Sequence, residues 1–285
     1  MDIKRYNYLR ATALKAAFAA AEKIMKIYGG DFVTDIKDDG SPVTTADTIA
    51  NTLIVNLLGQ TGLPVLSEES SIPGFSIRRS WKYYWLVDPL DGTREFMAGN
   101  GEFTVNIALI KESQPVMGVV LAPALQKAWY GSFIDNTSWI DGQEFWEASQ
   151  RDDPWDVFEN AFPGQGTKEN KKHIIAVSRS HVDDKTSEII RQINLKYNGS
   201  SLIKKGSSLK FCDLAEGTAT IYPRYASISE WDTAAGHALL NAAGGGVFDI
   251  VTEREMQYNG ETLKNPPFVA FANKSEADRF FSEIS

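Results

Sequence analysis

Two aspartates follow an apolar segment in a pattern that suits a divalent cation. Residues 83–87 are aromatic or aliphatic, Asp88 comes directly after them, and Asp91 stands three residues later, before a Gly-Thr pair. Because proline has no N–H for a strand ladder, Pro89 predicts that the strand ends at Asp88. Two carboxylates on such a short turn repel each other unless a cation lies between them. Mg²⁺ is the simplest candidate, since it binds carboxylate and phosphate oxygens.

Other acidic residues stand at the ends of regular elements elsewhere in the chain. Glu68 and Glu69 follow a short apolar strand expected at 63–67, and Asp232 precedes a helix of small residues at 233–243. Taken alone, two adjacent acids after a strand are usually part of a solvated loop. Strand ends and helix starts are nonetheless where layered α/β proteins bind ligands.

Asp47 has two interpretations at this stage. Thr44 or Thr45 can cap a helix expected at 46–58, and this places Asp47 in the first turn. A carboxylate is favoured there by the helix dipole alone. The second interpretation is a catalytic role, and it depends on the resemblance described below.

The composition argues against several classes of protein. The chain has 285 residues, 43% of them hydrophobic, which is enough for one large domain or two small ones. Its net charge of −8 argues against a nucleic-acid-binding surface, which needs clustered basic residues. The same charge repels a phosphorylated substrate unless cations intervene. With three histidines in the whole chain, a His-rich zinc site is not expected.

Cysteine usage and the start of the chain bear on its location. Cys212 is the single cysteine, so no intrachain disulfide can form, which fits a reducing compartment. The first residues lack a signal-peptide pattern, and no apolar run approaches the roughly 18 residues of a membrane-spanning helix. These features predict an intracellular protein without a transmembrane segment.

The hydrophobic pattern predicts two parts joined by a polar connection. Helices are expected at 3–28 and 46–58, and strands with the alternation of an antiparallel sheet follow them. Residues 150–172 are polar and contain Pro and Gly, so they mark the boundary between an N-terminal part at 1–149 and a C-terminal part at 173–285. In the C-terminal part strands alternate with helices, which is typical of an α/β arrangement.

The acidic segments together resemble the inositol monophosphatase superfamily of Mg²⁺-dependent, lithium-sensitive phosphatases. The matching segments are Ser-Glu-Glu-Ser at 67–70, Asp-Pro-Leu-Asp-Gly-Thr at 88–93 and Trp-Asp-Thr-Ala-Ala-Gly at 231–236. The branch of CysQ-type 3′(2′),5′-bisphosphate nucleotidases is similar over further segments, at 91–96, 100–110, 178–181 and 206–212. The resemblance implies an α+β / α/β layered sandwich (αβαβα), with an antiparallel sheet in the N-terminal half and a smaller mixed sheet in the C-terminal half.

The resemblance also implies a set of metal ligands. Glu68, Asp88 and the backbone carbonyl of Leu90 would hold one Mg²⁺, and Asp88, Asp91 and Asp232 would hold a second. A third, weaker ion near Glu68 is known in some members of the superfamily. Two such ions can stabilise the attacking and the leaving oxygen of an in-line displacement.

Catalytic roles follow from the same resemblance. The threonine that matches Thr93 hydrogen-bonds the attacking water, and the aspartate that matches Asp47 orients that threonine. Glu69 is expected to position the water or its neighbours. The amides of Gly92 and Thr93, at an expected helix start, can bind phosphate oxygens.

Four further residues match positions that contact the nucleotide in the CysQ-type branch, and each has an ordinary alternative. The hydroxyl of Ser207, with that of Ser208, can instead cap a helix that ends near 216. The other three can be a hydrogen-bonding loop residue and two solvated cations. These three are His181, Lys210 and Arg224.

The expected reaction is hydrolysis of the 3′-phosphate of adenosine 3′,5′-bisphosphate to AMP and phosphate, a step of sulfur metabolism, with 3′-phosphoadenosine 5′-phosphosulfate (PAPS) as a further substrate. Two alternatives stay open: an inositol or sugar phosphate phosphatase of the same superfamily, and a non-catalytic protein that binds nucleotides or divalent ions. The expected partner is a small phosphorylated nucleotide and not a nucleic acid. The resemblance suggests a cytoplasmic monomer or homodimer, and peripheral attachment to the inner face of the membrane stays open.

Overall fold

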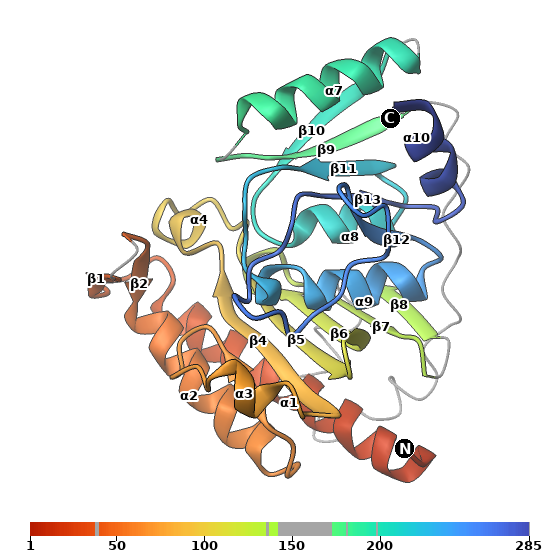
Figure 1. Ribbon diagram of the computed structural model, residues 1–285. Helices are drawn as coiled ribbons and strands as arrows, with labels where there is room; N and C mark the ends of the chain where they lie inside the picture. Colours follow the sequence, from red (N-terminus) through yellow and green to blue (C-terminus); the bar gives the residue numbers. More distant parts are fainter. Residues whose placement is uncertain (38–39, 135–136, 142–172, 181, 198, 285) are drawn as a thin grey trace.

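Helices and sheets alternate in layers, in the order helix, sheet, helix, sheet, helix (Figure 1). The computed structural model describes residues 1–37, 40–134, 137–141, 173–180, 182–197 and 199–284. The connection predicted at 150–172 lies outside these residues. Within them the predicted layered sandwich is confirmed, and no helix is long and apolar enough to cross a lipid bilayer.

The larger sheet has the strand order β3-β4-β5-β6-β7-β8. β3 runs parallel to β4, and every other neighbouring pair is antiparallel. The strands are β3 (Val65–Ser67), β4 (Tyr83–Asp91), β5 (Thr104–Lys111), β6 (Gln114–Ala122), β7 (Lys127–Ser132) and β8 (Thr137–Asp141).

The smaller sheet has the order β10-β9-β11-β13-β12 and is mixed, as expected. β10 and β11 run parallel to β9, whereas β13 is antiparallel to both of its neighbours. The strands are β9 (Ile174–Ser178), β10 (Ser201–Lys205), β11 (Ile221–Arg224), β12 (Gly246–Asp249) and β13 (Phe268–Phe271).

Helices fill the other layers. On one face of the larger sheet lie α1 (Ile3–Ile27) and α2 (Thr45–Gly59), between the sheets lie α8 (Leu209–Ala215) and α9 (Ala234–Ala242), and on the far face of the smaller sheet lie α7 (Asp184–Lys196) and α10 (Glu276–Ile284) (Figure 1). Shorter elements connect them: β1 (Thr34–Ile36), β2 (Pro42–Thr44), α3 (Phe75–Arg78), α4 (Thr93–Met97), η1 (Pro123–Leu125) and η2 (Glu230–Asp232).

The apolar sequence of β4 is explained by burial of both faces of the larger sheet. Successive side chains of a strand point to opposite faces. Trp85 and Val87 pack against α1 and α2, whereas Tyr84 and Leu86 pack against the layer of α8 and α9. A strand covered on both sides is continuously apolar, so the run before Asp88 marks a central strand.

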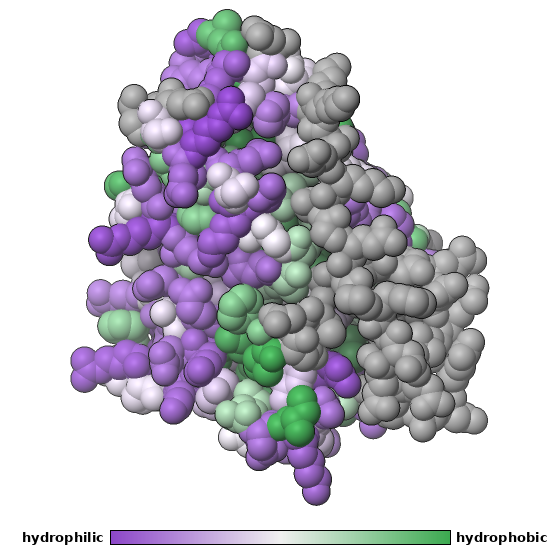
Figure 2. Space-filling view, turned by 90° about the vertical axis from the view of Figure 1, so that its right-hand side faces the viewer, coloured by the Kyte–Doolittle hydropathy of each residue, from purple (hydrophilic) through white to green (hydrophobic). Residues whose placement is uncertain are grey.

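Apolar side chains are thus mainly inside the layers, and polar ones dominate the exterior. Figure 2 shows one face of the molecule, on which the described residues are mostly hydrophilic and the hydrophobic ones gather in a band down the middle of the view. Exposed apolar residues are usual on the surface of a globular protein.

Two glycines let α9 lie directly on the larger sheet. A Cβ at Gly118 in β6 would come within 2.3 Å of the carbonyl oxygen of Ala235, and one at Gly131 in β7 within 2.5 Å of the Cα of Leu239. Any larger residue would push the helix away from the sheet. This close packing fixes the start of α9, and therefore also Asp232, which comes just before it.

The end of β4 differs from the prediction. The strand continues past Asp88 to Asp91, and its register with β5 shifts between these two residues, which pair with Asn106 and Thr104. The prediction that Pro89 ends the strand is wrong, because a bulge tolerates a residue that lacks an N–H. Both aspartates are therefore held by the sheet and not by a free turn.

Candidate active site

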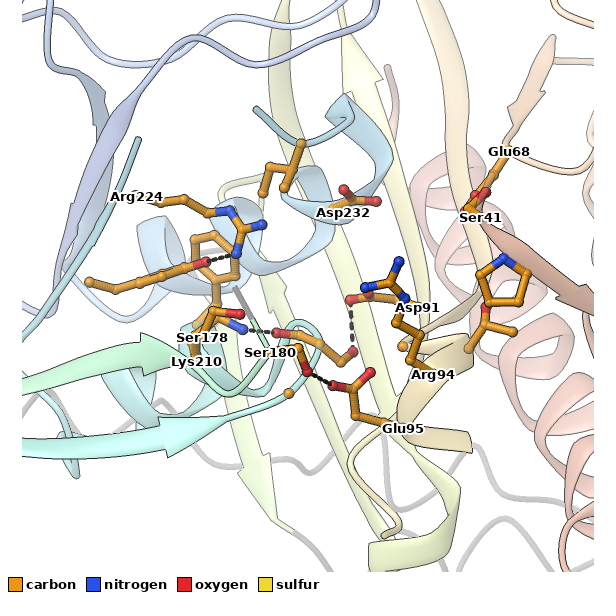
Figure 3. A pocket seen from close by; sticks show the side chains of 18 residues that line it. Ser41, Glu68, Asp91, Arg94, Glu95, Ser178, Ser180, Lys210, Arg224 and Asp232 are labelled. Carbon is orange, nitrogen blue, oxygen red and sulfur yellow. Dashed lines mark hydrogen bonds between the residues drawn. The ribbon is translucent and has the colours of Figure 1, made fainter. Parts of the chain in front are cut away.

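A pocket of about 290 Å³ opens where the end of β4 faces the segments that precede α8 and α9 (Figure 3). Segments that are far apart in the chain meet here: the ends of β3 and β4 from the larger sheet, and the ends of β9, β10 and β11 from the smaller one. Of the predicted site residues, those that line the pocket are Glu68, Asp91, Gly92, Thr93, Ser207, Lys210, Arg224 and Asp232.

Carboxylates gather on one side of this pocket. Glu68 follows β3, Asp88 lies in β4 and Asp232 ends η2, and one oxygen from each lies within 4.8 Å of the other two. Asp91 lines the same pocket. The predicted convergence of these residues is therefore observed.

The acidic cluster is electrostatically strained in the absence of a cation. Burial raises the pKa of Asp88 well above its ordinary value, and the charges of Glu68 and Asp91 raise it further. Burial also raises the pKa of Asp232, again with contributions from Asp91 and Glu68. A divalent cation among these oxygens would offset the repulsion, and an all-oxygen donor set is the kind that Mg²⁺ binds.

Hydrogen bonds orient Asp88 and Asp232 through the main chain. The backbone N–H of Leu90 donates to Oδ1 of Asp88 at 3.1 Å, and the N–H of Ser229 donates to Oδ2 of Asp232 at 2.9 Å. In each case the donor is local in sequence. The orientation of these two carboxylates therefore comes from the elements that carry them, the end of β4 for Asp88 and η2 for Asp232.

Asp91 is oriented by residues that are distant in the chain. Ser207 and Ser208 donate their hydroxyls to its Oδ2 at 2.7 and 2.8 Å, and Asn106 donates its amide at 3.2 Å. Capping of the following helix was the alternative considered for these serines. Ser208 is the N-cap residue of α8 but makes no side-chain cap bond, and both hydroxyls bond Asp91 instead. Ser207 has a left-handed backbone with φ +51°.

Asp47 lies in the first turn of α2, as predicted, and its two carboxylate oxygens have different partners. Its Oδ2 accepts from the backbone N–H and the hydroxyl of Thr44, at 2.8 and 2.6 Å, and so belongs to the capping box of α2. Its other oxygen, Oδ1, accepts from the hydroxyl of Thr93 at 3.1 Å. The same hydroxyl lies 3.4 Å from the carbonyl oxygen of Leu90. The capped helix thus presents one carboxylate oxygen to Thr93.

Glu69 lies apart from the pocket lining. Its carboxylate and that of Glu68 both accept from the ammonium group of Lys37, the second at 2.7 Å. Burial lowers the pKa of Lys37, but the two carboxylates more than offset this, so that the pKa lies above its ordinary value. Lys37 is a cation at the edge of the acidic cluster that the sequence pattern did not indicate.

The opposite side of the pocket is cationic. Lys210 is 3% exposed. Its ammonium group donates to the carbonyl oxygens of Ser207 and Lys205, and it lies 5.3 Å from the ring centroid of Tyr222. Arg224 is partly buried and bonds the carbonyl oxygen of Ala226 at 3.2 Å. Figure 3 shows both on the far side of the pocket from Glu68.

Neither cation is a solvated surface residue, which was the alternative considered for both. Among the described residues, no carboxylate forms an ion pair within 4.0 Å of Lys210 or Arg224. Burial of a cation without a charged partner is costly unless a ligand supplies the anion. His181, predicted to contact the nucleotide, lies outside the described residues.

Comparison with known proteins decides the family. The model of the inositol monophosphatase family matches residues 6–284. The chain belongs to this family. Within the family, it is 40% identical to the 3′(2′),5′-bisphosphate nucleotidase CysQ of Salmonella typhimurium over 89% of this chain and 92% of that protein. It is 30% identical to the CysQ of Haemophilus influenzae over 94% of each.

Solved structures of the family share the fold. CysQ from Bacteroides thetaiotaomicron superposes with a TM-score of 0.81 at 39% identity, over 95% of this chain and 98% of that one. The extragenic suppressor protein SuhB from Bartonella henselae superposes with a TM-score of 0.72 at 21% identity, over 96% and 98%. The second comparison concerns the fold alone. Enzymes of the inositol monophosphatase family depend on metal ions, and the acidic cluster can bind metal.

Proposed function

We propose that the protein is a 3′(2′),5′-bisphosphate nucleotidase that converts adenosine 3′,5′-bisphosphate to AMP and phosphate. The observation that carries the proposal is a single pocket with a carboxylate cluster on one side and, on the other, two cations that form no ion pair with any carboxylate among the described residues. The CysQ proteins to which the chain is 30–40% identical bear the name of this activity.

The two sides of the pocket suit the two phosphates of such a substrate. The scissile phosphate belongs beside the acidic cluster, where divalent ions can bridge it to the carboxylates. The other phosphate belongs beside Lys210 and Arg224, whose charges it would neutralise. A monophosphate leaves one side of the pocket without its counter-charge, so this arrangement favours a bisphosphate.

Glu68, Asp88, Asp91 and Asp232 would hold Mg²⁺, with the Leu90 carbonyl as an uncharged ligand. Two ions, and a third near Glu68, are the proposed complement. When bound, such ions polarise the phosphate and lower the pKa of a bound water. Asp88 is the residue placed to serve two ions, since it is buried next to both Glu68 and Asp91.

Thr93 and Asp47 would orient the attacking water and accept its proton. Because Asp47 accepts the hydrogen of the Thr93 hydroxyl, the oxygen of that hydroxyl is free to accept a hydrogen bond from water. Asp47 is itself held by the capping box of α2, so the hydroxyl has a fixed direction. Glu69 would act indirectly: its carboxylate binds Lys37 and so keeps this cation next to Glu68.

A substrate panel tests the proposal. Phosphate release is measured from adenosine 3′,5′-bisphosphate, 3′-AMP, PAPS and inositol 1-phosphate, each with and without Mg²⁺ and Li⁺. We expect Mg²⁺-dependent, Li⁺-inhibited release with the highest kcat/KM for the bisphosphate, and a loss of about tenfold or more for 3′-AMP. A marked preference for inositol 1-phosphate would refute the nucleotidase assignment and leave a phosphatase of the same family.

A further inference from the structure

Glu95 places a further carboxylate in the pocket, and this carboxylate does not belong to the acidic cluster. It lies in α4, lines the pocket and is 7% exposed. Ser180, from the segment after β9, donates its hydroxyl to Oε1 at 2.7 Å. In the part of the chain that the structure describes, no group donates to the second oxygen, Oε2. Figure 3 shows this carboxylate bonded to Ser180.

The position of this carboxylate is fixed by two glycines. A Cβ at Gly206 would come within 2.8 Å of Cγ of Glu95, so the side chain fills the space that this glycine leaves. A Cβ at Gly92 would lie 3.4 Å from Oε2. Gly92 has a left-handed backbone with φ +91° and joins Asp91 to Thr93. The free oxygen of Glu95 therefore borders the place where the scissile phosphate is expected.

A carboxylate oxygen in this place selects for a particular chemical group. It repels a phosphate oxygen, and as an anion it can only accept a hydrogen bond. Its partner on the substrate must therefore be a donor without negative charge, close to the scissile ester. In a nucleoside 3′-phosphate, the hydroxyl on the neighbouring carbon is the 2′-OH; in the 2′-phosphate isomer it is the 3′-OH.

We infer that Glu95 accepts a hydrogen bond from the hydroxyl on the carbon next to the one that carries the scissile phosphate. If the protein is the proposed nucleotidase, this hydroxyl is the ribose 2′-OH; that identification rests on the proposed function. Glu95 then makes the enzyme select ribonucleotides over 2′-deoxyribonucleotides. The same contact serves either regioisomer, because the two ribose hydroxyls are neighbours.

The experiment compares adenosine 3′,5′-bisphosphate with its 2′-deoxy analogue as substrates of the full-length protein in Mg²⁺. We expect wild-type kcat/KM to favour the ribose compound about 10- to 100-fold, the range of a hydrogen bond to a charged group. Glu95→Gln should bring this ratio close to one by slowing the ribose substrate alone. The reason is that Gln is neutral: its oxygen keeps the bond to Ser180, and its N–H₂ group can only donate to the hydroxyl, so the stronger bond to a charged acceptor is lost.

Glu102→Gln is the matched control. Glu102 is a carboxylate of the neighbouring loop that binds Arg179 at 2.6 Å and the Gly206 N–H at 2.8 Å, and it does not line the pocket. Its variant should keep the wild-type ratio, whatever its effect on the absolute rate. A wild-type ratio near one overturns the inference without any variant. Equal slowing of both substrates in Glu95→Gln also overturns it, since that result is expected of a purely structural residue.

A second substrate pair separates this inference from the proposed function. cis-2-Hydroxycyclohexyl phosphate and cyclohexyl phosphate differ by the same neighbouring hydroxyl but contain no nucleoside. If the protein discriminates this pair through Glu95 but does not hydrolyse the nucleotides, the nucleotidase proposal is wrong and the role of Glu95 stands. If it hydrolyses the nucleotides but does not discriminate either pair, the role of Glu95 is wrong. Absence of turnover with both pairs overturns both.

Discussion

Replacing Asp88 with asparagine should make the metal-free protein more stable while it abolishes activity. Asp88 is 1% exposed and lies beside other carboxylates, and these raise its pKa together with burial. Asparagine keeps the volume of the side chain, and its Oδ1 can still accept from the N–H of Leu90. Its amide can then donate to the carboxylates of Glu68 and Asp232, which Asp88 repels.

The size of this effect follows from the geometry. Oxygens of Asp88, Glu68 and Asp232 lie within 4.8 Å of one another, so each pair repels by roughly 3 kcal/mol at an effective dielectric constant of about 20. Protonation of Asp88 limits the cost, because its pKa is raised by burial and by the neighbouring carboxylates, and a carboxyl that binds a proton loses the charge that is repelled. We therefore expect the variant to gain about 2–4 kcal/mol, or a Tm roughly 4–8 °C higher for a chain of this size.

The assay is thermal unfolding at pH 7 in EDTA and in Mg²⁺, with turnover measured in parallel. Mg²⁺ should stabilise the wild type clearly and the variant much less, because the variant has lost a ligand and much of the repulsion that the ion offsets. Asp31→Asn, at an exposed position, serves as the control and should shift stability by less than about 0.5 kcal/mol. A metal-free Asp88→Asn protein that is less stable than the wild type would refute the electrostatic reasoning.

Three further predictions concern the proton path, the cationic side and the buried histidine. Thr93→Val should lower kcat by about 100-fold without a matching change in KM, whereas Thr93→Ser should keep most of the wild-type rate. Unimpaired turnover by the valine variant would show that the Thr93 hydroxyl has no role in activating the water. Lys210→Met should reduce the preference for adenosine 3′,5′-bisphosphate over 3′-AMP by about tenfold or more, whereas an unchanged ratio would place the second phosphate elsewhere. Burial lowers the pKa of His237, so the folded protein takes up a proton there at a lower pH than the unfolded chain, which gains one below about pH 6.5. The free energy of unfolding, measured by urea titration, should thus fall as the pH drops below 6.5, and this group contributes at most about 1.4 kcal/mol per pH unit. His237→Gln should make the free energy of unfolding depend less on pH. The same pH dependence in the wild type and the variant would contradict the role given to His237.

Errors in the sequence-based prediction share a physical cause. The end of β4 was misplaced because the bulge at Pro89 depends on how β5 pairs with it, and β5 lies later in the chain. Ser208 has the residue type and position of a helix cap, yet its hydroxyl bonds Asp91 from another layer. In both cases a local rule was overridden by a contact with a distant segment.

Packing decides other features that composition leaves open. Lys210 and Arg224 could equally have been solvated cations. Lys210 is buried because α8 lies between the two sheets, and Arg224 is partly buried because β11 lies within the smaller sheet. Glu95 carries no motif that separates it from an exposed acid at a helix start. Its burial depends on Gly206, whose missing side chain leaves room for it.

The sequence by itself determined the properties that act over a few residues. The apolar run before Asp88, the spacing of Asp88 and Asp91, and the capping position of Asp47 each follow from the chemistry of neighbouring residues. Only the tertiary structure decided which side chains share a pocket, which oxygens of Asp91 and Glu95 are occupied, and that an acidic side faces a cationic side. Those facts depend on distances between layers, and because the layers bring together segments separated by most of the chain, no local pattern encodes them.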